Sequence, residues 1–246
     1  MNDKDNPKTL MEHIIDLRSV IFHSFVFIIF CMILSGIFID DITNFILSPI
    51  IKFIPKSTKV VYTSITEPFT THMRITFYTS LFFSFPYIMF EIWKFIRPAL
   101  TQKETYYIKY IMISSYILFI LGSIFAFYIV VPNIISFLTS SSESGNNFMQ
   151  FLPKMSENVS FILILILSFG LSFQIPIVMI LLDRLHIVSI QIQKRVWREF
   201  VMCIVILSAI ITPPDAFSMI LLSVPLISLY FVSIFICSKF FTIKKQ

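Results

Sequence analysis

Six apolar segments divide the chain and are incompatible with a water-soluble fold. They occupy residues 20–39, 75–95, 107–131, 159–182, 200–211 and 216–237. All but the fifth have the roughly 20 residues that a helix needs to cross a bilayer. Of the 246 residues, 57% are hydrophobic and 13% are charged, whereas about a quarter of a soluble chain is charged. The sequence therefore predicts one polytopic domain over residues 1–246, an all-α membrane protein.

The fifth segment, residues 200–211, is short. Twelve residues make a helix of about 18 Å, against a hydrocarbon core of about 30 Å. Arg198 and Thr212 flank this segment, and they lengthen it slightly. A bilayer can also thin around a short helix. We expect a short fifth span, and therefore six transmembrane helices.

The basic residues predict how these six helices are oriented. If the N-terminus is inside, the N-terminal stretch, the second-to-third and fourth-to-fifth connections and the tail hold three, four, four and three of the 19 lysines and arginines. The positive-inside rule then places both termini in the cytoplasm, with residues 238–246 as a basic tail. The same residues form no continuous basic stripe with an aromatic platform, so nucleic acid is not expected as a partner.

The N-terminal residues 1–19 predict an amphipathic cytoplasmic helix that leads into the first span. Thr9 and Glu12 have the spacing of a capping box, which places the helix start near Leu10. Glu12 and Asp16 follow one another at i and i+4, so they share one side of the helix. The pair is either a solvated polar face or an anionic cradle at the membrane surface for a cationic partner.

A second acidic candidate, Glu104, lies on the same predicted side of the membrane, within "RPALTQKETYY". Thr101 and Glu104 again have capping-box spacing, here for the third span. Capping a helix and binding a ligand are compatible roles, and the spacing favours neither.

The fourth segment contains a polar interruption. Residues 161–182 carry no charge, but Gln174 and Pro176 lie past its middle. Proline removes a backbone donor, which frees the carbonyl of Ser172. Gly170, one turn before the glutamine, predicts free space beside its amide. Gln174 either makes a helix–helix hydrogen bond or faces a ligand pocket.

The outer connections carry one further candidate, and enzymatic motifs are missing from the sequence. Asp215 is placed to cap the sixth span after the turn formed by Pro213 and Pro214. The piece "ITNFILSPIIKFIP" predicts an amphipathic surface segment. The four histidines and three cysteines are dispersed. We therefore expect no catalytic residue, no metal site and no cofactor.

Four motifs occur in order along the chain: "HIIDLR" (13–18), "FIRPALTQKE" (95–104), "FGLSFQIPIV" (169–178) and "ITPPDAFSMILLSVPLISLY" (211–230). Together they resemble the TatC family, the polytopic subunit of the twin-arginine protein translocase, over nearly the whole chain. The resemblance implies six spans with both termini cytoplasmic, and proline-kinked helices around a concave pocket. Pro49, Pro86 and Pro225 match the bends of the family.

The same resemblance implies a signal-peptide receptor rather than an enzyme. Its binding carboxylates map to Asp16 and Glu104. The family usually has glutamate at the first position, so the shorter Asp16 is a departure, for which neighbouring Glu12 is placed to compensate. Further implied positions are Arg18 in the first motif, the membrane pocket of Gln174, Gly170 and Pro176, and the partner-contact positions Asp215, Pro213, Pro214 and Pro49.

The implied partners are twin-arginine signal peptides of folded cargo, small single-span TatA/TatB-type subunits, further copies of the chain in a larger complex, and membrane lipid. No nucleotide-binding loop is present, so energy must come from elsewhere, and the resemblance implies the proton motive force. The expected location is the bacterial plasma membrane, or the inner membrane of an organelle that encodes the protein itself.

Two other functions compete with this interpretation. A small-solute secondary transporter would show pseudo-symmetric halves and charged midplane residues, and the sequence has no internal repeat. A purely structural assembly factor would not need carboxylates at the membrane surface.

Overall fold

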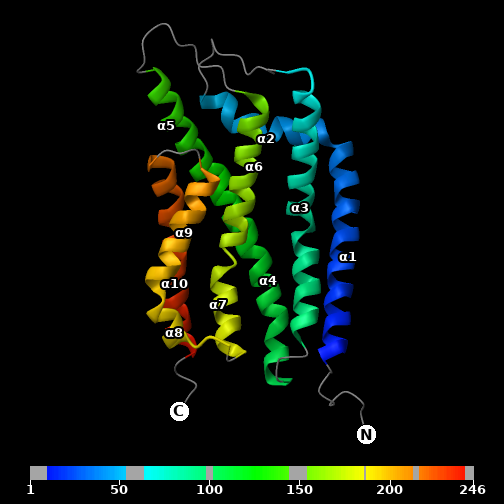
Figure 1. Ribbon diagram of the computed structural model, residues 1–246, viewed down its shortest axis with the longest axis vertical. Helices are drawn as coiled ribbons and strands as arrows, with labels where there is room; N and C mark the ends of the chain where they lie inside the picture. The colour runs from blue at the N-terminus through cyan, green and yellow to red at the C-terminus, as the bar shows by residue number, and fades with distance from the viewer. Residues whose placement is uncertain are drawn as a thin grey trace.

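The computed structural model describes residues 10–53, 64–97, 102–143, 154–185, 187–212 and 216–241, which form a bundle of helices (Figure 1). The prediction of an all-α protein is confirmed. The elements in chain order are α1 (Leu10–Ile37), α2 (Ile39–Phe53), α3 (Glu67–Ile96), α4 (Gln102–Phe125), the π-helix η2 (Ala126–Val130), α5 (Val131–Glu143), α6 (Met155–Ser172), α7 (Ile175–Arg184), α8 (Ile190–Arg195), α9 (Trp197–Ile211) and α10 (Ala216–Phe241).

Five stretches of the described chain are long and apolar enough to cross a membrane. They are residues 14–37, 67–96, 110–137, 155–184 and 216–238. The remaining apolar helix, α9, has 15 residues, which corresponds to about 22 Å. It coincides with the short fifth span predicted from the sequence and is shorter than the hydrocarbon core.

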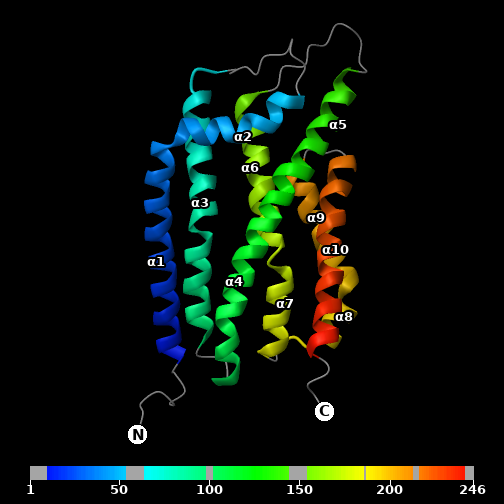
Figure 2. The same cartoon turned by 180° about the vertical axis from the view of Figure 1, so that it is seen from behind.

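The two ends of the bundle differ. Figures 1 and 2 show that α1 begins and α10 finishes at the same end, which we call the terminal end. At the opposite end, α2 crosses the bundle roughly at right angles to the long helices. It contacts α1, α3, α5 and α6. This transverse helix covers most of the amphipathic piece predicted to lie at the membrane surface.

Helix α1 stands at the edge of the bundle and packs almost entirely along α3 (Figure 2). The two helices run in opposite directions. Phe27 stacks on Tyr87 with ring centroids 4.3 Å apart, and a Cβ on Gly36 would lie 4.0 Å from Thr76 Cγ2. These two contacts fix the antiparallel register of α1 against α3.

The third predicted span is longer than expected. The sequence placed its end at Val131 and a connection after it, but the helix continues through η2 into α5 and ends at Glu143. At the end of η2 the Val131 N–H donates to the Ala126 carbonyl five residues earlier, whereas the bonds of an α-helix reach back four residues. Pro132 has no N–H to donate, so this wider turn directly before the proline lets the helix continue past it.

The fourth predicted span is broken where its polar interruption lies. Helix α6 ends at Ser172, and α7 begins at Ile175 with Pro176 in its first turn. At the break, the Gln174 N–H donates to the Leu171 carbonyl at 2.9 Å. Pro176 cannot donate to Ser172, so the regular pattern cannot continue. The expected proline kink is confirmed here as a break.

The main apolar core lies where α3, α6, η2 and α5 meet, with α9 and α10 packed against one side. Ile75, Val131, Ile134, Val159 and Leu165 are fully buried in it. Many serines are also buried, and their hydroxyls donate to carbonyls three or four residues earlier in the same helix. Such pairing allows helices to pack closely in a medium without water.

Candidate functional site

The acidic candidates are carried by two helices that begin at the terminal end (Figure 1). Asp16 is half-buried in the second turn of α1, and Arg18 is exposed two residues later. Glu12 lies in the first turn of α1 and Glu104 in the first turn of α4, but their side chains lie outside the described residues. The arrangement brings the beginnings of both helices to one face of the molecule.

Asp16 lies on the side of α1 that faces α3. The less exposed residues of this helix recur at Asp16, Val20, Ser24, Phe27 and Cys31, with the spacing of three and four that defines one helical face. Asp16 precedes Phe27 by eleven residues, or about 16 Å along the axis.

Because α3 runs in the opposite direction, the same distance from Tyr87 leads to the end of α3, where Arg97 is its exposed C-cap residue. Asp16 therefore lies level with the end of α3. This places a carboxylate at the terminal end of the bundle, level with the last turn of α3.

Sequence reasoning missed a buried acid, Glu91, on α3. Its side chain is 7% exposed, and its carboxylate lies 3.7 Å from the Lys94 ammonium. The Tyr87 side chain, one turn earlier, also interacts with it. A charge within the predicted second span was the available signal, since ionisable residues inside membranes are rare and commonly functional. The Tyr87 ring in turn stacks on α1, so Glu91 supports the helix pair that carries Asp16.

The structure places Gln174 between helices. Its side chain is 7% exposed, and its Nε2 donates to the Ser115 carbonyl of α4 at 2.9 Å. Its Oε1 accepts a hydrogen bond from the Ser115 hydroxyl. The helix–helix hydrogen bond, one of the two roles weighed from the sequence, is therefore present. A role for Gln174 as a pocket residue remains a prediction.

The prediction of free space beside Gly170 is wrong. A Cβ at this position would lie 2.7 Å from Phe119 Cε2 and from Ser123 Oγ, both on α4. Gly122 of α4 is equally close to α6, since its Cβ would lie 2.7 Å from the Phe169 carbonyl oxygen. Two glycines thus allow α4 and α6 to touch, and the space vacated by each is filled by the opposite helix.

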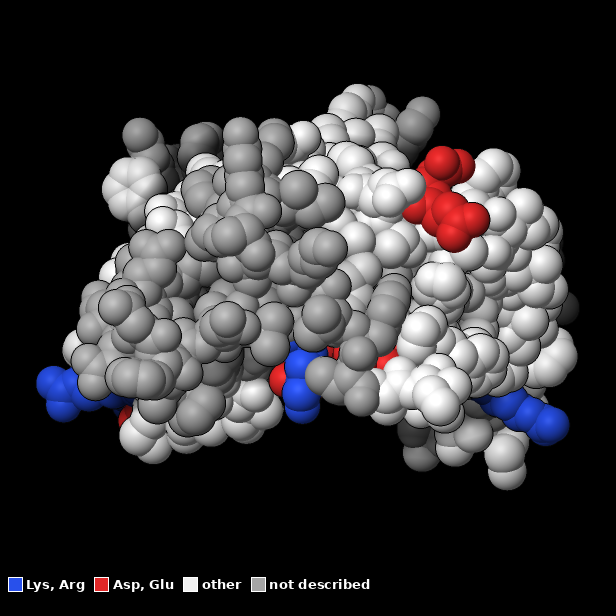
Figure 3. Space-filling view, turned by 90° about the horizontal axis from the view of Figure 1, so that it is seen from above, with Lys and Arg blue, Asp and Glu red and all other residues white. Residues whose placement is uncertain are grey.

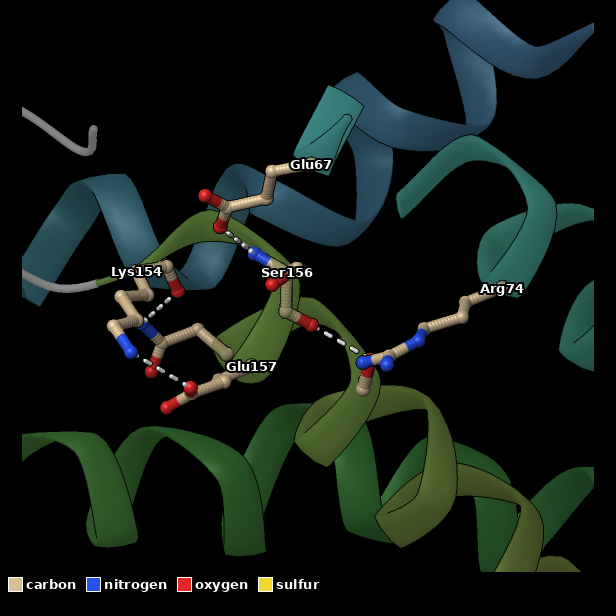
Figure 4. Close-up of polar contacts among 7 residues, drawn as sticks. Glu67, Arg74, Lys154, Ser156 and Glu157 are labelled. Atoms are coloured by element: carbon tan, nitrogen blue, oxygen red, sulfur yellow. Dashed lines mark hydrogen bonds and ion pairs between the residues drawn. The ribbon is translucent and has the colours of Figure 1, made fainter. Parts of the chain in front are cut away.

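A second polar network, also missed from the sequence, joins α3 to the first turns of α6 at the opposite end of the bundle. Figure 4 shows the Glu67 carboxylate directed at the Ser156 backbone, whose N–H donates to Oε1 at 3.2 Å. Arg74 Nη1 donates to the Ser160 hydroxyl at 3.0 Å, and that hydroxyl donates to the Ser156 carbonyl at 2.6 Å. Glu67 is 5% exposed. It acts as a cap for α6 supplied by another helix, a role that no local sequence pattern reveals.

The end of the bundle opposite the terminal end carries few described charges. Figure 3, looking down on this end, shows acidic side chains gathered in one exposed group and further acidic atoms, partly covered, beside a basic side chain near the centre. Asp40 and Asp41, in the first turn of α2, are both exposed. The predicted outer residues Asp215, Pro213 and Pro214 lie outside the described residues, as does the side chain of Pro49.

Within the part of the chain that the structure describes, no group of three histidine, cysteine or acidic side chains is placed to hold a metal ion. What the geometry defines is a multi-pass helical membrane protein with a half-buried carboxylate at the terminal end and polar contacts between its helices.

Comparison with known proteins identifies the family of this multi-pass helical membrane protein. The family model described as Sec-independent protein translocase protein (TatC) matches residues 12–225. The chain belongs to the TatC family. Proteins of this family are components of a protein translocase and are not enzymes.

Individual relatives agree with this membership. The Sec-independent protein translocase protein TatC of Haemophilus influenzae is 32% identical over 94% of this chain and 89% of its own length. That of Rickettsia prowazekii is 34% identical, with 94% and 92% covered. A crystal structure described as the twin arginine translocase receptor TatC superposes with a TM-score of 0.80 at 28% identity, covering 91% of this chain and 96% of that one. The six-span prediction is consistent with this family.

Proposed function

We propose that the protein binds paired-arginine signal peptides at Asp16 and Glu104, as the receptor subunit of a twin-arginine translocase that exports folded proteins. The observation that carries the proposal is the position of Asp16, half-buried on the α3-facing side of α1 at the end where α4 begins, with Glu104 in the first turn of α4. In the proposal this terminal end is the cytoplasmic side of a bacterial plasma membrane, as the basic residues predict.

The chemistry of the ligand suits two separated carboxylates. Each guanidinium presents a planar fork of donors that matches one carboxylate bidentately. One acid would bind any basic tail, whereas two acids on different helices favour two adjacent arginines. Asp16 reaches about one methylene less than the usual glutamate, and Glu12, one turn away in α1, is placed to add charge. Arg18, the exposed cation of the motif, lies two residues after Asp16 in α1, and it is proposed as a further residue of the binding site.

The apolar segment of the signal peptide requires a second contact inside the membrane. In the proposal it lies against the break between α6 and α7, with Pro176 maintaining the break. The Gln174–Ser115 bond must then either persist beside the ligand or be exchanged for a contact with it. Small single-span subunits and further copies of this chain complete the translocase, with Pro49, Pro213, Pro214 and Asp215 as the proposed outer contacts.

Crosslinking of a paired-arginine peptide to membranes tests the proposal. We expect labelling to fall at least about tenfold in Asp16→Ala and in Glu104→Ala, because each removes a charged hydrogen-bond partner. Asp41→Ala, which removes an exposed acid at the opposite end, is the matched control and should label like wild type. A paired-lysine peptide should label weakly throughout. Equal labelling of all variants would refute the site.

A further inference from the structure

A basic surface that the signal-peptide site does not use lies at the terminal end, where α8 meets α9 (Figure 1). Lys194, Arg195 and Arg198 are all exposed there, with one exposed acid, Glu199, beside them. Trp197 lies among them and is 39% exposed. The Arg198 guanidinium carbon is 5.5 Å from the centre of the tryptophan ring, within the range of a cation–π contact.

The contacts of the same segment show that these basic residues point away from the bundle. The Gln193 carbonyl accepts a hydrogen bond of 2.5 Å from the Tyr230 hydroxyl of α10. The Phe200 ring stacks on that of Tyr230 with centroids 4.2 Å apart. Gln193 and Phe200 therefore define the inward face. Within α8, Arg195 lies about 200° around the helix from Gln193 and Lys194 about 100°, and within α9 Arg198 lies about 200° from Phe200. Arg195 and Arg198 therefore lie on the outward faces of the two helices, and Lys194, which is also exposed, lies on the flank of α8.

The inner side of this segment is fixed by further polar contacts. Gln193 Nε2 donates to the Met179 carbonyl at 3.1 Å and to the Val188 carbonyl at 3.0 Å. The Asp183 carboxylate accepts from the Ile190 N–H at 3.0 Å, so this acid is engaged at the start of α8. The basic side chains thus project from a segment held at both ends.

The shortness of α9 adds a reason for an anchor at this position. A helix of about 22 Å is shorter than a core of about 30 Å, so it crosses only where the bilayer thins, and an anchor at one end would fix its depth. Tryptophan favours the level of the headgroups, and arginine and lysine there bind phosphate oxygens, arginine bidentately. The cytoplasmic leaflet, to which the basic residues assign this end, carries the anionic lipids.

We propose that Lys194, Arg195 and Arg198, with Trp197, form a binding site for the phosphate headgroups of anionic phospholipids, which anchors the start of α9 in the cytoplasmic leaflet. The occupant is lipid, because the cations surround a half-exposed tryptophan at the edge of an apolar helix. The site is independent of signal-peptide binding, so either proposal can fail while the other stands.

Tryptophan fluorescence tests this site directly, because the chain has two tryptophans and Trp93 is buried. A Trp93→Phe variant in zwitterionic bilayers leaves Trp197 as the reporter. Trace phosphatidylglycerol with brominated acyl chains should quench it, and half-quenching should need about fivefold less lipid than with brominated phosphatidylcholine, the preference that one basic contact provides. Equal quenching by the two lipids would overturn the proposal.

Three further variants separate the site from general surface charge. The triple variant Lys194→Gln, Arg195→Gln and Arg198→Gln should lose the preference, and Arg195→Lys with Arg198→Lys should keep most of it. The control is a second triple variant, which combines Arg18→Gln, Lys94→Gln and Arg97→Gln. It removes the same number of positive charges from the α1–α3 side of the terminal end, and it should leave the preference for phosphatidylglycerol intact. A preference that survives the first triple variant, or disappears in the second, would contradict binding at α8 and α9.

Discussion

The amide of Gln174 uses both of its polar atoms on a single residue of another helix, Ser115. The contact joins α4 to the break between α6 and α7, directly beside the place where Gly122 and Gly170 bring the two helices together. A polar residue in hydrocarbon needs such a partner. The glutamine that interrupts an apolar span is therefore part of the packing of α4 against α6 and α7.

Replacing Gln174 with leucine should reduce stability, because two interhelical hydrogen bonds are lost. Bonds of this kind in membranes contribute about 0.6 kcal/mol on average, so we expect a loss of about 1–2 kcal/mol for the pair. Unfolding in detergent measures it. Ser172→Ala is the control, since that hydroxyl bonds only within its own helix, to the Ser168 carbonyl, and should change stability little.

The same Gln174→Leu variant distinguishes the two roles of the residue. Crosslinking of a paired-arginine peptide should remain close to wild type, because the carboxylates at the terminal end are untouched, while export of a folded cargo should fall. Export at the wild-type rate would show that Gln174 serves packing alone.

Substituting alanine for the two interfacial glycines should be severe. At Gly122 the added Cβ would lie 2.7 Å from the Phe169 carbonyl oxygen, a backbone atom that cannot rotate away. We expect Gly122→Ala to lower the free energy of unfolding by about 1–3 kcal/mol, the range of overpacked cores.

Gly36→Ala provides the matched control for Gly122→Ala, since its nearest contact would be an ordinary 4.0 Å. Alanine within a helix is favoured over glycine by roughly 0.5–1 kcal/mol, so Gly36→Ala should be neutral or stabilising. Similar losses in both variants would contradict the close approach of α4 and α6.

The cap that Glu67 provides for α6 should be measurable. Glu67→Ala leaves the Ser156 N–H without its carboxylate, and we expect a loss of about 1 kcal/mol or more in unfolding experiments. Glu157, in the same turn, makes an exposed ion pair with Lys154 at 3.2 Å. Glu157→Ala should therefore change stability by no more than about 0.5 kcal/mol, and an equal effect of both substitutions would refute the cap.

The stack of Phe27 on Tyr87 should matter for ligand binding as well as for packing, because α1 is held mainly by α3. Phe27→Ala should loosen the register that places Asp16 level with the end of α3, and should lower peptide crosslinking. Phe25→Ala removes an equally large ring, 60% exposed on the same helix, and should leave crosslinking unchanged. Loss of labelling in both would point to general damage to α1.

The features that the sequence could predict were those encoded locally. The apolar segments, the short fifth helix and the break at Pro176 each follow from residues close together in the chain. The extension of the third span past Pro132 was missed, because proline commonly ends or kinks a helix, and the wider turn of η2 that accommodates it is visible only in the fold. Ser115 as the partner of Gln174, and Ser156 as the partner of Glu67, lie 59 and 89 residues away along the chain, so only the fold reveals them.

Gly170 shows the same limit on what the sequence can predict. From the sequence, the missing side chain of Gly170 predicts empty space, whereas the opposite helix has moved into it. Sequence identifies where a helix lacks bulk, but whether a ligand or a neighbouring helix uses that gap depends on what packs there.

A charge-swap measurement tests the central claim that Asp16 binds a signal-peptide arginine. Crosslinking would compare wild type and Asp16→Arg, each with a paired-arginine peptide and with a peptide in which glutamate replaces one arginine. We predict that Asp16→Arg loses labelling by the paired-arginine peptide and gains labelling by the glutamate peptide. Undiminished labelling of Asp16→Arg by the paired-arginine peptide would contradict the account.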